Sequence, residues 1–173
     1  MPEWLNTLLS LIAGSMLAMV SGWVNDRRAT ARDQQARAEE RRDCLRLRRD
    51  DFQREALIKL QDTAMRLARC AGAANHQDVM AFRKTGKWQK QMLSEDLDEQ
   101  FRLQTAEMVL LATRIRDEKA RNLAGEFREQ CAEVGFAKSE NAAERTLITM
   151  SQRLTELHER SGQLIRELDD AQG

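Results

Sequence analysis

The sequence predicts an all-α protein: an N-terminal transmembrane helix continues into a long helix, and an antiparallel three-helix, coiled-coil-like bundle follows. Three observations predict this class. Residues 4–24 carry no charged side chain. Apolar residues then recur at spacings of three and four along most of the chain, which is typical of helices that pack side by side. The 173 residues include one proline, five valines, five isoleucines and no tyrosine, whereas the abundant Ala, Leu, Arg, Glu and Gln are typical of long helices.

Residues 4–24 are predicted to form a membrane anchor. The segment has 21 residues, 14 of them apolar. As a helix it would span about 31 Å, close to the bilayer core of about 30 Å. Trp4 and Trp23 stand at its ends, where amphipathic rings prefer the headgroup level. Two alternatives stay open. A cleaved signal peptide would need a basic start and a shorter apolar core. A buried core helix would accommodate the polar Asn6 and Thr7.

The residues that follow this segment predict its orientation. Residues 25–44 contain six arginines, beginning with Arg27 and Arg28, and the other flank contains none. Basic residues beside a membrane span stay on the cytoplasmic side. We therefore expect a single-pass protein of the inner (cytoplasmic) membrane, with its N-terminus outside and the rest of the chain in the cytoplasm. Arg27 and Arg28, together with the two tryptophans, would contact the bilayer interface.

Small residues recur every four positions along the predicted span. They are Ser10, Gly14, Ala18 and Gly22. At this spacing they share one side of a helix and let a second helix backbone approach closely. This pattern predicts self-association of the protein, or pairing with another membrane helix, through the span. The alternative is that small residues are simply common in membrane helices.

The rest of the chain is expected to form an arginine-rich helical stalk over residues 25–44 and a helical bundle over residues 45–173. Apolar residues recur every seven positions along the stalk and into the bundle, at Ala31, Ala38, Leu45 and Phe52. The first bundle helix is expected over residues 45–73. Its seam has spacings of three and four, at Leu57, Leu60, Ala64, Leu67 and Ala71. Gly72 and Asn75 give the first stop signal.

A second bundle helix is expected over residues 94–134, with Ser94 as its N-cap and Gly135 as its stop. Its seam is Leu97, Phe101, Met108, Leu111, Ile115, Leu123, Phe127, Cys131 and Val134. A second stripe of Leu103, Ala106 and Leu110 predicts burial from two sides, as in the middle helix of a bundle.

The third bundle helix is expected over residues 139–170, capped by Ser139. Its seam is the most regular in the chain, at Leu147, Met150, Leu154, Leu157, Ser161, Leu164 and Leu168. Three antiparallel helices would place the segment 75–93 and the turn near Gly135 at opposite ends of the bundle.

A basic turn interrupts the apolar pattern at residues 83–90. Its members are Arg83, Lys84, Lys87, Trp88 and Lys90, next to Phe82. Cations interleaved with aromatic rings can hold nucleic acid or another anionic partner by charge and stacking. The interpretation that we favour is a helix connection, with Phe82, Trp88 and Met92 covering the end of the bundle and the lysines in water. Nucleic acid is not expected, because the cytoplasmic part as a whole is not basic.

The sequence gives no candidate for catalysis. It contains no glycine-rich nucleotide loop and neither an H-E-x-x-H nor an E-x-x-H pair. Its histidines, His76 and His158, stand among polar residues. Its cysteines, Cys44, Cys70 and Cys131, are widely spaced, which fits a reducing compartment better than a disulfide or zinc framework. We therefore expect no enzyme activity, no catalytic residue, no cofactor and no metal.

The arrangement of residues 1–71 resembles a loose group of small bacterial and phage proteins. In these proteins an N-terminal membrane helix is followed by an arginine-rich helix, here beginning N-D-R-R, and by a helical bundle. The resemblance rests on layout and composition. It implies a bacterial or phage-encoded inner-membrane protein and carries over no functional residue.

These observations predict a membrane-anchored tether, adaptor or assembly component that acts by protein–protein interaction. Its partners would be the lipid bilayer, a protein and, through the membrane helix, a second copy of itself. Two alternatives stay open. One is a phage or host-defence protein of the exclusion type, whose span disturbs or senses the membrane. The other is a binder of nucleic acid or of an acidic protein through the turn at residues 83–90.

Overall fold

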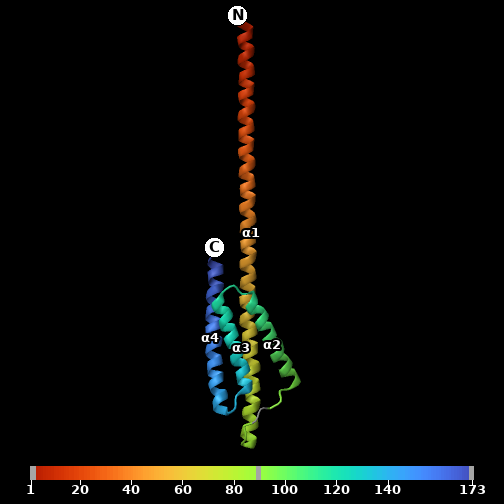
Figure 1. Cartoon of the computed structure of the whole chain (residues 1–173), viewed down its shortest axis with the longest axis vertical. Coiled ribbons are helices and arrows are strands. Elements are labelled where there is room, and N and C mark those ends of the chain that lie inside the picture. The colour runs from red at the N-terminus through yellow and green to blue at the C-terminus, as the bar shows by residue number, and fades with distance from the viewer. Residues whose placement is uncertain (1–2, 89–90, 172–173) are drawn as a thin grey trace. The chain divides into compact units, whose positions relative to one another are not determined.

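The computed structural model describes the backbone of residues 3–88 and 91–171, and the side chains of residue 32, residues 34–88 and residues 91–171. All regular secondary structure in these ranges is helical. The helices are α1 (Glu3–Thr85), α2 (Glu95–Arg114), α3 (Glu118–Phe136) and α4 (Glu140–Asp170), labelled in Figure 1. The all-α class that was predicted from composition and periodicity is confirmed.

The chain divides into two units, residues 1–48 and residues 49–173. In the first unit the described side chains, Arg32 and residues 34–48, are all exposed. Ala38 and Leu45, which belong to the expected seven-residue repeat, are among them. The repeat therefore marks no buried seam in the described part of this unit. In the second unit its next member, Phe52, is also exposed.

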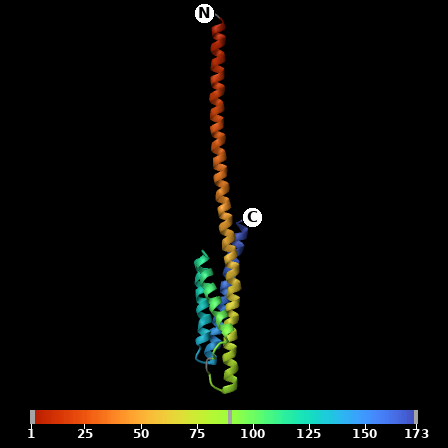
Figure 2. The same ribbon diagram turned by 90° about the vertical axis from the view of Figure 1, so that its right-hand side faces the viewer.

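Residues 49–173 form a bundle in which the chain runs alternately in opposite directions (Figures 1 and 2). The contacts between α3 and α4 show their antiparallel pairing. Arg153 Nε lies 3.1 Å from Glu126 Oε2, and Arg160 Nη2 lies 2.5 Å from Asp117 Oδ2. Residues late in α4 thus meet residues early in α3, as in an up-and-down bundle.

Helix α1 closes the bundle by packing beside both α4 and α2. On the α4 side, Arg54 Nε lies 3.1 Å from Asp169 Oδ1, and the Gln61 side chain donates a hydrogen bond to the His158 carbonyl at 3.2 Å. On the α2 side, the Gln53 side chain donates to a carbonyl in the last turn of α2. The bundle in residues 49–173 therefore contains four helices rather than the three that were expected.

The core consists largely of the predicted seams. In α1 the buried positions Leu57, Leu60, Ala64, Leu67 and Ala71 follow the predicted spacing. In α3 and α4 the completely or almost completely buried residues include Leu123, Phe127, Cys131, Val134, Leu157 and Ser161. Burial of these side chains removes apolar surface from water and provides the main driving force for folding. These seams were predicted correctly because apolar residues spaced three and four apart lie on one face of a helix, and that face is the one that is buried.

The expected end of the first bundle helix near residue 73 is wrong. Helix α1 continues through Gly72 and Asn75 to Thr85. The heptad spacing also continues, with Ala74 and Asp78 buried, so packing outweighs the stop signal of one glycine and one asparagine. The helix ends at Gly86, whose φ of 68° lies in the left-handed region that glycine adopts without strain.

The expected single helix over residues 94–134 is also wrong. It is two helices, α2 and α3, joined by residues 115–117. Ile115 is extended (φ −83°, ψ 133°) and ends α2, and Asp117 is the N-cap of α3, where its side chain accepts a hydrogen bond from Ala120 N. The other expected caps, Ser94 and Ser139, are confirmed, since their hydroxyls accept from Leu97 N and Ala142 N.

The expected burial of α2 from two sides is wrong as well. Met108 and Leu111 are buried, but Leu103 and Leu110 are about half exposed, at 48% and 51%. In an up-and-down bundle each helix directs one stripe to the core and the opposite face to water. The stripe of Leu103, Ala106 and Leu110 lies on that outer face.

Among the residues that the structure describes, we find no helix with the length and apolar character needed to cross a membrane. The predicted span, residues 4–24, lies outside the part of the chain whose side chains are described. The same is true of the predicted packing residues Ser10, Gly14, Ala18 and Gly22 and of the predicted interface residues Trp4, Trp23, Arg27 and Arg28.

Candidate functional site

One end of the bundle is organised around the connection between α2 and α3. Gln53 of α1 is almost fully buried, and its amide bridges this connection. Its Nε2 donates to the Arg114 carbonyl at 2.8 Å, and its Oε1 accepts from Arg116 N at 2.9 Å. Arg121 Nη1 donates to the carbonyls of Ile115 and Arg116. Backbone groups that the helix break exposes thus find partners in side chains.

Asp117 joins the same connection to α4. Its carboxylate accepts from Ala120 N at 2.8 Å and pairs with both Nε and Nη2 of Arg160, at 3.1 and 2.5 Å. Both side chains are about four-fifths buried, with 20% and 22% exposed. The hydrogen bond from Arg160 holds the pKa of Asp117 below its ordinary value of 3.8, although burial acts in the opposite direction. The carboxylate is therefore charged at neutral pH.

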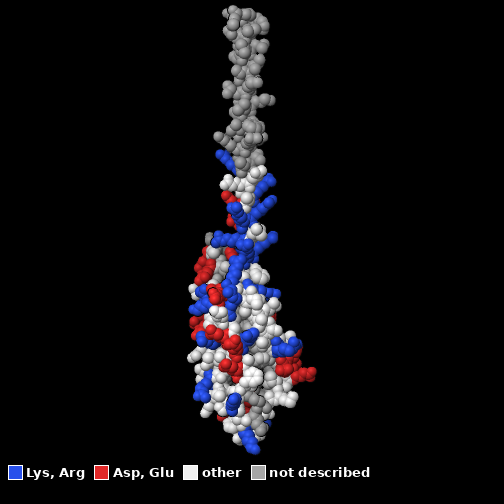
Figure 3. All heavy atoms as spheres, viewed as in Figure 1, with Lys and Arg blue, Asp and Glu red and all other residues white. Residues whose placement is uncertain are grey.

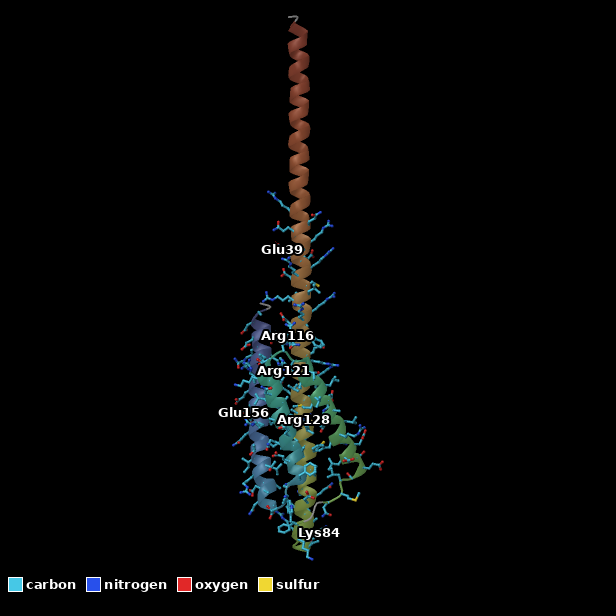
Figure 4. All side chains as sticks on the ribbon, viewed as in Figure 1. Glu39, Lys84, Arg116, Arg121, Arg128 and Glu156 are labelled. Atoms are coloured by element: carbon cyan, nitrogen blue, oxygen red, sulfur yellow. The ribbon has the colours of Figure 1, made fainter. Side chains whose placement is uncertain are left out.

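A cavity of about 320 Å³ lies beside this connection. Its apolar lining comes from Leu57, Ile115, Leu164 and Leu168, and its polar lining from Asp50, Gln53, Arg116, Asp117 and Glu167. In Figure 4 the labelled Arg116 and Arg121 mark this end of the bundle. The cavity therefore offers both apolar and charged groups to whatever enters it.

The basic turn lies at the other end of the bundle, where Figure 4 labels Lys84. Arg83, Lys84 and Lys87 are exposed, and Lys90 lies outside the described residues. Trp88 is half-buried: its ring meets Phe82 edge-on, with ring centroids 5.7 Å apart and planes at 71°, and its Nε1 donates to the Ala137 carbonyl at 3.0 Å. Trp88 thus fastens the turn to the α3–α4 connection.

The contacts of the basic turn bear on its two interpretations, a helix connection and a binding site for an anionic partner. The buried Asp78 accepts from Gln91 N at 2.8 Å, so the turn is held from a second position. Phe82 and Trp88 cover the end of the bundle as the connection interpretation predicts. Met92 does not, since it is almost fully exposed. The exposed cations still offer a surface to an anionic partner, but Trp88 is engaged in the fold rather than presented for base stacking.

The turn also corrects the expected topology. The segment 75–93 and the turn near Gly135 lie at the same end of the bundle, because Trp88 reaches Ala137. The reason is the break at residues 115–117, which turns the chain back once more than was expected. Sequence reasoning therefore missed the residues that depend on this break, namely Gln53, Asp117 and Arg160. One signal was present: the predicted seam has a gap of eight between Ile115 and Leu123, immediately around an aspartate that can cap a helix.

The remaining candidates for chemistry are metal-binding groups and the three cysteines. Within the described residues, no group of three His, Cys, Asp or Glu side chains is placed to hold a metal ion. Cys70 and Cys131 are buried and Cys44 is exposed. Burial raises the pKa of the Cys131 thiol to about 12 and that of Cys70 above its ordinary value. These two thiols are therefore poor nucleophiles at neutral pH.

Comparison of this chain with protein-family models, with curated proteins and with solved structures found no match.

Proposed function

We propose that this protein is a single-pass, membrane-anchored helical adaptor. Residues 4–24 would hold it in the inner membrane with the N-terminus outside, and the bundle of residues 49–173 would bind a protein partner in the cytoplasm. One observation carries the proposal: an uncharged segment of 21 residues is followed directly by a segment with six arginines. This pattern is typical of a span whose basic flank is cytoplasmic.

The bundle supports a binding role by the surfaces that it offers. The cavity at the α2–α3 connection is lined by both apolar and charged residues. The outer face of α2 exposes large apolar side chains. Both features are typical of surfaces that recognise proteins. The adaptor would act by location and binding: the span fixes the protein at the membrane, and the bundle retains a partner there.

Membrane attachment is tested by fractionation with a matched pair of variants. Ile12→Arg/Leu17→Arg places two charges near the centre of the predicted span, at a cost of about 2.5–3.5 kcal/mol each. Ile12→Leu/Leu17→Ile keeps the span apolar. The natural protein and the apolar control should resist extraction by high salt and alkali, and the arginine variant should become extractable. Extraction of the natural protein by alkali would overturn the anchor.

The adaptor role is tested by the fate of the partner. A protein that is cross-linked to the bundle in cells should leave the membrane fraction when the Ile12→Arg/Leu17→Arg variant replaces the natural protein. It should stay at the membrane with the apolar control. A partner that remains at the membrane in both cases has another anchor, and the adaptor role would then be wrong even if the span is correct.

A second candidate is recognition of an acidic protein through the basic turn. The specific observation is that Arg83, Lys84 and Lys87 are exposed on one short stretch at the end of the bundle. Arg83→Gln/Lys84→Gln/Lys87→Gln should release such a partner. The control Arg69→Gln/Lys59→Gln/Lys119→Gln removes the same charge from exposed positions elsewhere on the bundle. Equal retention by both triple variants would exclude the turn as the binding site.

A further inference from the structure

The outer face of α2 carries an apolar stripe that the bundle leaves exposed. Leu103, Val109 and Leu110 are 48%, 42% and 51% exposed. Successive residues of an α-helix are rotated by about 100°, so these three side chains lie within about 60° of Ala106. The buried Met108 and Leu111 lie on the opposite side of the helix. The stripe is therefore a separate face and not the edge of the core.

Charges of opposite sign stand at the two ends of this face. The first turn of α2 contains Glu95, Asp96 and Asp98, and the last turn contains Arg114. In Figure 3 a red patch lies on the side of the molecule where Figure 1 labels α2. Between the ends, Glu99 and Arg102 pair with each other at 2.7 Å. Their mutual neutralisation leaves a central face that does not repel a like surface.

We propose that this face binds the same face of a second copy of the chain, with the two α2 helices antiparallel about a two-fold axis at Ala106. Leu103 lies three residues before Ala106, and Leu110 lies four residues after it. An antiparallel pairing therefore brings Leu103 of each copy opposite Leu110 of the other. Asp96 lies ten residues before Ala106, and Arg114 lies eight residues after it. The same pairing therefore brings Asp96 of each copy close to Arg114 of the other. A two-fold interface forms each contact twice.

The charge pattern selects a second copy in this orientation. Parallel helices would bring two acidic first turns together, which is unfavourable, whereas antiparallel helices bring an acidic end to a basic end at both sides. Alanine at the centre lets the helices approach closely. The contact is a single helix face, so it belongs with the weak interfaces that bury less than about 1,200 Å² in total. It is distinct from pairing through residues 4–24 and does not depend on the anchor.

Cross-linking in the full chain tests the proposed axis. In a Cys44→Ser background in detergent, Ala106→Cys puts a thiol on the axis, and Thr113→Cys puts one on the same exposed face seven residues away. The axial thiols would be within disulfide reach, and the control thiols would be separated by about 21 Å along the helices. We expect the axial variant to form the disulfide-linked dimer about tenfold faster or more, since disulfides need Cα atoms within about 7 Å. Equal cross-linking rates for the two variants would overturn the proposal. Equal rates are also what we expect if the two copies are held together only through residues 4–24.

Charge exchange tests the register. Asp96→Arg and Arg114→Asp, each added to the Ala106→Cys variant, should slow its cross-linking by repulsion between the two copies. The double exchange Asp96→Arg/Arg114→Asp should restore the rate, since each pair re-forms with reversed sign. Both positions are exposed, and an unchanged thermal unfolding midpoint would verify that the bundle is intact. If the single variants cross-link as fast as the parent, or the double exchange does not recover, the α2 pairing is wrong.

Discussion

The Asp117 carboxylate joins two helices at the α2–α3 connection. It ends the α2–α3 connection, caps α3 through Ala120 N and pairs with Arg160 of α4. The cap and the ion pair act on different neighbours, so two substitutions separate them. Asparagine keeps a capping oxygen and loses the charge, whereas alanine loses both. Comparing the two substitutions therefore measures how much the cap and the ion pair each stabilise the α2–α3 connection.

Asp117→Asn should lower the free energy of unfolding by about 1 kcal/mol at neutral pH, as for a partly exposed ion pair. Asp117→Ala should lower it by about 2 kcal/mol, because a lost N-cap costs about 1 kcal/mol more. Denaturant unfolding monitored by circular dichroism measures both values. Equal losses for the two variants would mean that the ion pair, rather than the cap, accounts for the whole effect.

The same substitution predicts a pH dependence. The pKa of Asp117 is lower in the folded protein than its ordinary value of 3.8. Its stabilisation is thus fully present above that value and is lost as the pH falls through the lower, folded-state pKa. The difference in unfolding free energy between the natural protein and Asp117→Asn should shrink below pH 3.8 and stay constant between pH 5 and 7. A difference that grows on acidification would contradict the assigned direction.

The cysteines give a second prediction at this scale. Cys44 is exposed, whereas Cys70 and Cys131 are buried with raised pKa values, about 12 for Cys131. A water-soluble disulfide reagent should therefore label one thiol per chain rapidly. The other two should react only as fast as the bundle opens, since thiolates are the reactive form. Rapid labelling of all three, measured by mass spectrometry, would show that the core around α1 and α3 is open.

At the scale of the helices, the difference between sequence and structure lies in the connections. The seam of α4 is regular, and its cap Ser139 is visible in the sequence, so both were predicted. The break at residues 115–117 was not, because arginine and acidic residues also occupy helix surfaces. The sequence signal for the break was the gap of eight residues between the seam positions Ile115 and Leu123. The backbone partners of Gln53 could not be predicted from the sequence, since they depend on which helix connection packs against α1.

Gln53 should therefore stabilise the break more than its residue type suggests. Gln53→Leu keeps the volume of the side chain but removes both hydrogen bonds to the connection, which should cost about 1–3 kcal/mol. The control Gln61→Leu removes one longer hydrogen bond, of 3.2 Å, to the His158 carbonyl and should cost less. Hydrogen exchange should show faster exchange at Arg116 N in the first variant only. An unchanged rate at that amide would argue against the bridge.

At the scale of the whole molecule, the core formed by the described side chains lies in one of the two units. Every residue of the hydrophobic cluster falls between Ala56 and Leu168, within the unit of residues 49–173. This described core and the predicted anchor, residues 4–24, therefore fall in different units. The sequence predicted the wrong number of helices for the bundle.

A fragment of residues 49–173 should consequently fold without the rest of the chain. We expect it to be highly helical and to unfold in one cooperative transition, as single domains of this size usually do. Circular dichroism with thermal and chemical denaturation measures both properties. A matched fragment of residues 75–173, which lacks most of the α1 seam, should not fold. A broad, non-cooperative transition in the longer fragment would show that residues 1–48 are required.

The ion pair of Arg54 with Asp169 has a mechanical consequence. It places the start of the bundle's first helix and the last turn of α4 next to each other, at one end of the unit. A load applied between residues 49 and 170 would then pull apart two adjacent helices from their shared end. Such a load breaks contacts one turn at a time, instead of sliding whole helices past each other against all their contacts together. The bundle should therefore open at low force, from the end that holds the α2–α3 connection, and Trp88 at the far end would respond last.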